Sequence, residues 1–284
     1  MTTTALAGHA LQTRSVDGLA IRFVDTGEQS GPTLLMTSPW PESLFAFRRI
    51  WDQLAPVTRL VAVDLPGFGH SEGRTELFTP SAMAQFLHEL IGGWGLETPH
   101  LLAPDVGTGA APFLAGRHPG SVASVIVGSG GAAYPLEVSG ALADMIAAPD
   151  TDFLKDFDSR TSVGAAVEPA APRTREPEVW EDYVTAYEDG RFAESARYVR
   201  AYPVELPVLG ELLPFITTPV QVMNAEHDEL VPPSNGTYLH ERLPNSRLAS
   251  FDSGHFPWEQ SAADYGAVIA DWIAGEYARV GSAA

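Results

Sequence analysis

LLAPDVGTG, residues 101–109, combines an apolar run, a turn of small residues and the start of a helix-forming segment. Strand, sharp turn and helix in this order are typical of Gly-x-Ser-x-Gly, whose central residue is an exposed nucleophile. Here the central position is occupied by Asp105. A carboxylate is ionised at neutral pH, attacks carbon without a base and forms an alkyl ester. The segment therefore points to substrates with an electrophilic sp3 carbon and away from ester substrates.

Length and composition limit the classes of function. The 284 residues, 45% of them hydrophobic, suffice for one α/β domain with an insertion. The formal net charge of −19 argues against a nucleic-acid partner and against an anionic membrane surface. The absence of cysteine excludes disulfides, thiolate zinc sites and iron–sulfur clusters. The N-terminal sequence has neither a basic start nor a long apolar stretch, so a cytoplasmic location is expected.

Short apolar runs alternate with helical patterns, which predicts an α/β fold with a mostly parallel sheet. Eight strands are predicted at His9–Arg14, Ala20–Val24, Thr33–Thr37, Arg59–Val63, His100–Ala103, Val122–Val127, Val220–Asn224 and Arg247–Phe251. The first two lie close together and are expected to form an antiparallel hairpin at the edge of the sheet. Helices are predicted to begin near Ser43, Ser81, Gly107, Ser234 and Ala262.

The pattern changes between residues 133 and 216, where no strand signal occurs. This segment contains the helical stretches Pro177–Gly190 and Phe192–Ala201 and a Pro-rich loop at Val167–Pro177. We interpret it as a helical lid inserted after the sixth strand, with residues 1–132 and 217–284 forming the core. Lids of this kind close over a site and exclude water from it.

Two further polar residues follow predicted strands. Asp228 comes after the seventh strand, and His255 lies in the loop after the eighth. Taken singly, each aspartate fits a helix N-cap and the histidine fits a surface position. α/β-Hydrolases typically have a nucleophile, an acid and a histidine in this chain order, each at the carboxyl end of a strand. Ligands bind at this edge of open α/β sheets. The three together therefore favour a catalytic site.

The chain resembles the α/β-hydrolase superfamily over nearly its whole length. Within that superfamily it is similar to the branch with an aspartate nucleophile, the epoxide hydrolases and haloalkane dehalogenases. Ser38-Pro39-Trp40-Pro41 corresponds to the His-Gly-x-Pro loop of the family, and Gly67–Ser71 to its Gly-x-Gly-x-Ser stretch. The chain departs from the family at Ser38-Pro39, at Pro104 in place of the usual His, and at Val106 in place of the common Trp.

The resemblance implies an eight-stranded α/β-hydrolase fold and a two-step mechanism. Asp105 attacks an epoxide carbon while a lid tyrosine, Tyr198, donates a hydrogen bond to the developing alkoxide. His255, oriented by Asp228, then activates the water that hydrolyses the Asp105 ester. The implied product is a vicinal diol, and the implied reaction uses no cofactor and no metal.

The resemblance also implies an oxyanion hole, formed by the backbone N–H groups of Trp40 and Val106. The expected partner is a small apolar organic substrate, and a homodimer is left open. Aromatic side chains are expected to line the substrate pocket, although they fit the packing of the lid on the core equally well. The candidates are Trp180, Tyr183, Tyr187, Tyr202 and Phe256.

Three alternatives stay open. Haloalkane dehalogenation would use the same Asp105–His255 relay, but Val106 has no side-chain donor for a leaving halide. A catalytically silent hydrolase fold that acts as a binding protein would fit the altered loop and Pro104. A serine esterase would need Ser71 or Ser129 as nucleophile, and neither occupies the strand–turn–helix position.

Overall fold

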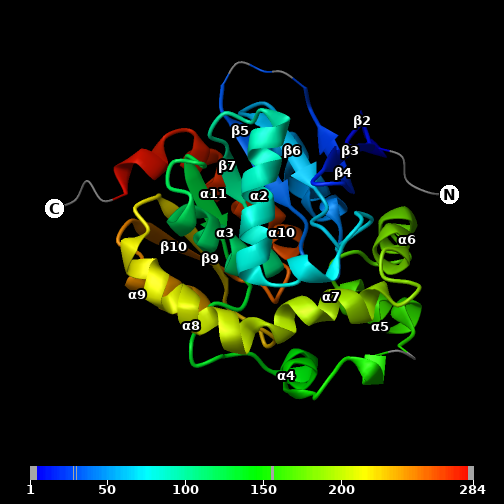
Figure 1. Ribbon diagram of the computed structural model, residues 1–284. Helices are drawn as coiled ribbons and strands as arrows, with labels where there is room; N and C mark the ends of the chain where they lie inside the picture. The colour runs from blue at the N-terminus through cyan, green and yellow to red at the C-terminus, as the bar shows by residue number, and fades with distance from the viewer. Residues whose placement is uncertain (1–4, 28, 30, 155–156, 281–284) are drawn as a thin grey trace.

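The computed structural model describes residues 5–27, 29, 31–154 and 157–280. The strands of its main sheet are β3 (Gln12–Val16), β4 (Leu19–Asp25), β5 (Thr33–Thr37), β6 (Arg59–Val63), β7 (His100–Leu102), β8 (Ser124–Val127), β9 (Val220–Ala225) and β10 (Ser246–Phe251). Their order is β10-β9-β8-β7-β5-β6-β4-β3 (Figure 1). Only β4 runs against its two neighbours, which confirms a mostly parallel sheet of eight strands.

The N-terminal strand prediction is wrong in its extent. The predicted strand His9–Arg14 is divided between β2 (His9–Ala10), which pairs with β1 (Ala5–Leu6) in a separate small sheet, and β3. β3 continues to Val16 because it forms a two-residue hairpin with β4. The hairpin residues Asp17 and Gly18 both have positive φ, as a type I′ turn requires. This turn chemistry sets the register of the edge strand.

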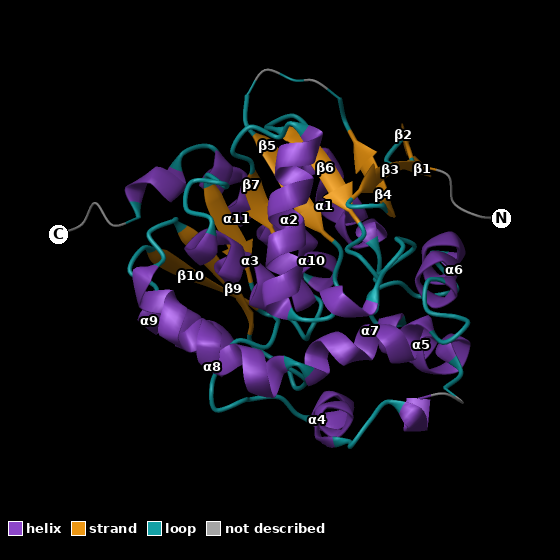
Figure 2. Cartoon of the chain, viewed as in Figure 1, coloured by secondary structure: helices purple, strands orange, loops and turns teal. Residues whose placement is uncertain are grey.

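Helices cover both faces of the sheet (Figure 2). α2 (Pro80–Trp94) and α3 (Val106–Arg117) lie on the face toward the viewer, and α1 (Arg48–Leu54) and α11 (Ala262–Ile273) lie behind the strands. α2 begins one residue before the predicted Ser81, because the Thr79 side chain caps it by accepting a hydrogen bond from the Ala82 N–H. The remaining core helices are η1 (Leu44–Phe47), η2 (Thr75–Leu77), α9 (Ser234–Arg242), α10 (Pro257–Gln260) and η5 (Glu276–Arg279).

The described residues between β8 and β9 form helices and loops but no strand. Figure 1 places α5, α7 and α8 in a row across the lower edge of the sheet, with α4 beyond them. We call residues 133–216 the lid, and its exact boundaries stay a prediction. Its helices are α4 (Gly140–Ala147), η3 (Asp152–Leu154), α5 (Ser159–Val167), α6 (Pro177–Thr185), α7 (Arg191–Arg200), α8 (Tyr202–Leu212) and η4 (Leu213–Phe215).

A buried ion-pair network joins lid helix α6 to the core. Arg22 of β4 contacts Asp64 through Nε at 2.5 Å, and it contacts both carboxylate oxygens of Asp182 at 2.7 and 3.0 Å. Ser43 donates a further hydrogen bond of 2.6 Å to Asp182. Burial by itself lowers the pKa of Arg22, but the two carboxylates outweigh it and raise that pKa above its ordinary value. The network therefore fixes one end of the lid over the sheet.

We expect Asp182→Ala to destabilise the protein by about 3–5 kcal/mol, because it leaves the buried Arg22 guanidinium without half of its partners. Denaturant unfolding monitored by circular dichroism measures this loss. Glu181→Ala is the matched control on the same helix, since Glu181 forms a largely exposed ion pair with Arg160. Its cost should stay below about 1 kcal/mol. Equal losses in the two variants would show that the network does not anchor the lid.

Candidate active site

Asp105 stands at a strained turn between β7 and α3. Its backbone angles are φ 52° and ψ −118°, a conformation that a residue with a side chain rarely adopts. The surrounding glycines make the turn possible. A Cβ atom on Gly107 would lie 2.8 Å from the Cβ atom of Ala103, and one on Gly130 would lie 2.0 Å from the Asp105 carbonyl oxygen. The small residues of the sequence motif therefore reflect close packing around the raised carboxylate.

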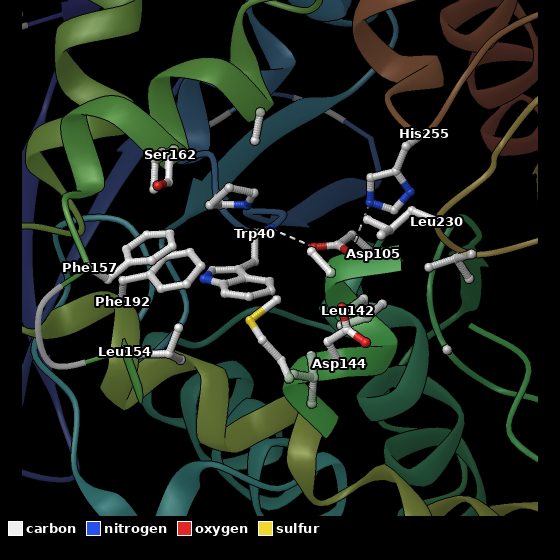
Figure 3. Close-up of a pocket in the computed structure, with 18 of the residues that line it drawn as sticks. Trp40, Asp105, Leu142, Asp144, Leu154, Phe157, Ser162, Phe192, Leu230 and His255 are labelled. Atoms are coloured by element: carbon white, nitrogen blue, oxygen red, sulfur yellow. Dashed lines mark hydrogen bonds and ion pairs between the residues drawn. The ribbon is translucent and has the colours of Figure 1, made fainter. Parts of the chain in front are cut away.

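The structure brings the three predicted polar residues together. His255 Nδ1 lies 2.8 Å from Asp228 Oδ2, and His255 Nε2 lies 3.6 Å from Asp105 Oδ1. The second carboxylate oxygen of Asp228 accepts hydrogen bonds from the backbone N–H groups of Leu230 and Val231, at 3.0 and 2.8 Å. Figure 3 shows the imidazole of His255 facing Asp105. This arrangement can orient the imidazole and pass a proton between it and a group bound at Asp105.

His255 is held in its charged form by this arrangement. Burial by itself lowers its pKa, but the hydrogen bonds and negative charges of Asp105 and Asp228 outweigh burial and raise the pKa to about 10. The imidazole is therefore protonated at neutral pH. Loss of either negative charge lowers the pKa and makes the ring available as a base.

The loop after β5 supplies a backbone donor to the nucleophile. The N–H of Trp40 donates a hydrogen bond of 2.5 Å to Asp105 Oδ2. The indole Nε1 of Trp40 donates to Ser195 Oγ of α7 at 2.9 Å, so the loop is tied to the lid. Ser195 carries no sequence signal for this role. Val106 participates through its carbonyl oxygen, which accepts a hydrogen bond from Tyr198, and an oxyanion-binding role for its N–H stays a prediction.

A cavity of about 710 Å³ opens above Asp105 between the sheet and the lid. One wall is a stack of aromatic rings, with centroids 4.9 Å apart between Trp40 and Phe192 and 4.1 Å apart between Phe192 and Phe157 (Figure 3). Much of the remaining lining is apolar and comes from α4 and α5, two helices that the sequence patterns do not predict. The main apolar residues from these helices and from η3 are Leu142, Met145, Phe153, Leu154 and Val163.

Two of the five predicted pocket residues, Tyr202 and Phe256, line the cavity. The other three lie outside it and pack the lid, which corrects the prediction. Trp180 packs against α5, and the Arg173 guanidinium lies over the Trp180 ring, 4.5 Å from the ring centroid. Tyr183 donates a 3.1 Å hydrogen bond to the buried Glu259, and Tyr187 donates to the Glu42 carbonyl oxygen at 2.8 Å. Their hydroxyl groups therefore satisfy buried acceptors.

The lid tyrosines Tyr198 and Tyr202 differ in their surroundings. Tyr198 is fully buried, donates its hydroxyl hydrogen bond to the Val106 carbonyl oxygen at 2.9 Å and does not line the cavity. Tyr202 lines the cavity, and its hydroxyl group forms no hydrogen bond with another described residue. Burial and the negative charge of Asp105 raise the pKa of Tyr202 well above its usual value, so its hydroxyl keeps its proton. This geometry favours Tyr202 over the predicted Tyr198 as a donor.

The alternative serine nucleophiles lie outside the cavity lining. Ser71 is fully buried, and its hydroxyl donates to the Asp64 carbonyl oxygen at 2.8 Å. Ser129 is buried beside the turn, with a φ of 51°. Among the residues that the structure describes, no cluster of three or more His, Cys, Asp or Glu side chains is placed to hold a metal ion. Within the same described ranges, no helix has the length and apolar character needed to cross a bilayer.

Comparisons with known proteins agree with this fold. Residues 32–262 match the family model described as alpha/beta hydrolase fold. A haloalkane dehalogenase of Bradyrhizobium diazoefficiens is 25% identical over 91% of this chain and 92% of its own length. Epoxide hydrolase 3 of Xenopus tropicalis is 30% identical over 45% of this chain, a match that spans only 35% of that protein. The crystal structure of Cfl2 from Burkholderia cenocepacia superposes with a TM-score of 0.81, covering 96% of this chain and 98% of Cfl2 at 24% identity.

We expect the His255 imidazole to titrate near pH 10 and to titrate at lower pH in Asp105→Asn, which removes one of two neighbouring negative charges. NMR titration of the ring Cε1–H signals measures both values. His100 is an internal control, because burial lowers its pKa to about 4 and the substitution should not change it. The pKa of His255 is about 10 in the folded protein and 6.5 in the unfolded chain. The stability that its charge contributes is therefore complete below pH 6.5 and is lost as the pH rises through 10. Titration near 6.5 in the unmodified protein would contradict this prediction.

Proposed function

Because this chain belongs to the alpha/beta hydrolase fold family, we propose that it is a hydrolase that opens an epoxide to a vicinal diol through an ester on Asp105. One observation carries the proposal. A carboxylate nucleophile faces a protonated histidine, and a tyrosine with its proton retained lines the same cavity. Ring opening of an epoxide needs both a nucleophile for carbon and a proton donor for oxygen.

In the first step, Asp105 Oδ1 attacks an epoxide carbon and the ring carbon–oxygen bond breaks. Oδ2 remains on the Trp40 N–H, where it becomes the carbonyl oxygen of the ester. Tyr202 donates its hydroxyl hydrogen bond to the oxygen that leaves the carbon. The apolar lining around this region strengthens these polar contacts, because little water competes for them.

In the second step, water attacks the carboxyl carbon of the Asp105 ester. Alkylation removes the negative charge that helps keep His255 protonated, so the imidazole releases its proton and becomes a base. The alkoxide formed by ring opening gains one proton, and His255 releases one, so the protons balance. Asp228 keeps Nδ1 protonated, which leaves Nε2 to accept a proton from water. Hydrolysis restores the Asp105 carboxylate and the imidazolium.

Dehalogenation by the same relay is the second candidate, supported by the match to the Bradyrhizobium haloalkane dehalogenase. The surroundings of Asp105 favour it less. Val106 has no side-chain donor, and the Trp40 indole N–H already donates to Ser195. Trp180, whose indole N–H would be another side-chain donor from the lid, lies outside the cavity lining. A leaving halide would therefore lack the side-chain N–H groups that it needs, whereas an epoxide oxygen would meet the hydroxyl of Tyr202.

We expect His255→Gln to be alkylated by its substrate but not to hydrolyse the ester, so turnover falls at least about a thousandfold. The protein is incubated with a panel of epoxides and haloalkanes, and its intact mass and peptide map are recorded. An adduct on Asp105 with the mass of a whole epoxide is the expected result. Asp105→Asn is the control and should form no adduct. An adduct lighter than its haloalkane by HX, with none from epoxides, would replace epoxide opening by dehalogenation.

We expect Tyr202→Phe to slow the alkylation step about a hundredfold, because the leaving alkoxide loses its proton donor. Single-turnover kinetics in the His255→Gln background isolates this step. Tyr198→Phe is the matched control, because it removes a hydroxyl that bonds only to the Val106 carbonyl oxygen among the described contacts. Its alkylation rate should change less than about threefold, with about 1 kcal/mol lost in stability. The reverse pattern of rates would assign Tyr198 as the proton donor.

A further inference from the structure

Asp144 places one carboxylate in the apolar part of the cavity lining. Besides Asp105, His255 and Tyr202, it is the only titratable side chain among the lining residues, and the described lining contains no lysine or arginine. It projects from α4, whose residues Leu142 and Met145 line the same wall. Figure 3 shows its side chain beside Leu142 and apart from His255.

The Asp144 side chain is exposed, so it marks the region where the cavity meets solvent. Its carboxylate forms no hydrogen bond or ion pair with another described residue. A carboxylate in contact with solvent retains its charge at low cost, yet it adds nothing to the packing of α4. Its position is therefore better explained by an effect on what enters or occupies the cavity.

The charges along the lining do not cancel. Asp105 and Asp228 both lie beside the His255 imidazolium, so the triad already carries an excess negative charge, and Asp144 adds a second one on the lid side of the cavity. In a cleft with apolar walls, one uncompensated charge affects a charged ligand more strongly than it would on an open surface. Two opposite charges about 5 Å apart at an intermediate dielectric attract enough to change affinity about tenfold.

We propose that Asp144 is a specificity-determining residue that selects substrates carrying an ammonium group in addition to the reacting carbon and disfavours carboxylates. The proposal rests on the proposed function for the identity of the reacting group, an epoxide. The apolar lining of the cavity accommodates the rest of such a molecule, with the aromatic stack of Trp40, Phe192 and Phe157 on one side. The substrate class is thus an apolar epoxide with a protonated amine.

The test measures binding, so it does not depend on turnover. Isothermal titration calorimetry compares three ligands of similar shape, 4-phenylbutylamine, 4-phenylbutanol and 4-phenylbutanoate, in the unmodified protein. We expect the amine to bind about tenfold more tightly than the alcohol and the carboxylate to bind more weakly than both. In Asp144→Asn the preference for the amine over the alcohol should fall to less than about twofold. Salt at 0.5 M should reduce it in the unmodified protein, because the charge is exposed.

Glu194→Gln is the matched control, since it removes the same charge from an exposed position on lid helix α7 outside the cavity lining. The amine preference should be retained in this variant. An equal loss in Asp144→Asn and Glu194→Gln would assign the preference to the overall charge of −19 and overturn the proposal. An unchanged preference in Asp144→Asn would overturn it as well. A protein that shows the Asp144-dependent preference but forms no Asp105 adduct with any epoxide would retain the charge selection and refute the epoxide chemistry.

Discussion

The ion pair between the Asp105 carboxylate and the His255 imidazolium is the interaction on which the rest of the site depends. It forms only if the turn after β7 holds Asp105 at a strained positive φ and the loop after β10 places His255 within 3.6 Å. Asp228, held by two backbone N–H groups, is the third component. Packing around glycine residues holds the strained turn in place. The negative charges of Asp105 and Asp228 stabilise the protonated form of His255, which burial alone would disfavour.

Polar contacts attach the lid to the core, so that the lid covers the cavity but does not fill it. Arg22 and Asp182 fix α6 at one side, and the indole of Trp40 reaches Ser195 of α7 close to the nucleophile. Trp40 thus donates its backbone N–H to Asp105 and its indole N–H to the lid. Movement of α7 would therefore disturb the loop after β5 directly. This coupling gives a physical reason for a mostly apolar cavity, covered by the lid, over a charged triad.

Local patterns predicted the sheet and the triad because both depend on short stretches of sequence. Apolar runs mark buried parallel strands, and β5 and β6 begin and end where these runs do. Asp105, Asp228 and His255 follow three strands that point the same way, so their side chains had to meet at one edge of the sheet. Helices α4 and α5 carry weaker patterns. Neither helix was therefore predicted, and Asp144 was not identified as a residue of the cavity wall.

The sequence alone specified an α/β-hydrolase core with an aspartate in place of the usual nucleophile, because strand order and chain direction dictate which loops converge. It did not specify the direction of each lid side chain. Tyr198 and Tyr202 lie four residues apart, and the family resemblance favoured Tyr198 as the donor, yet Tyr198 donates to a backbone carbonyl and Tyr202 lines the cavity. The break between α7 and α8 at Ala201 separates them. Side-chain direction at such a break depends on packing against distant residues, and only the folded chain supplies those contacts.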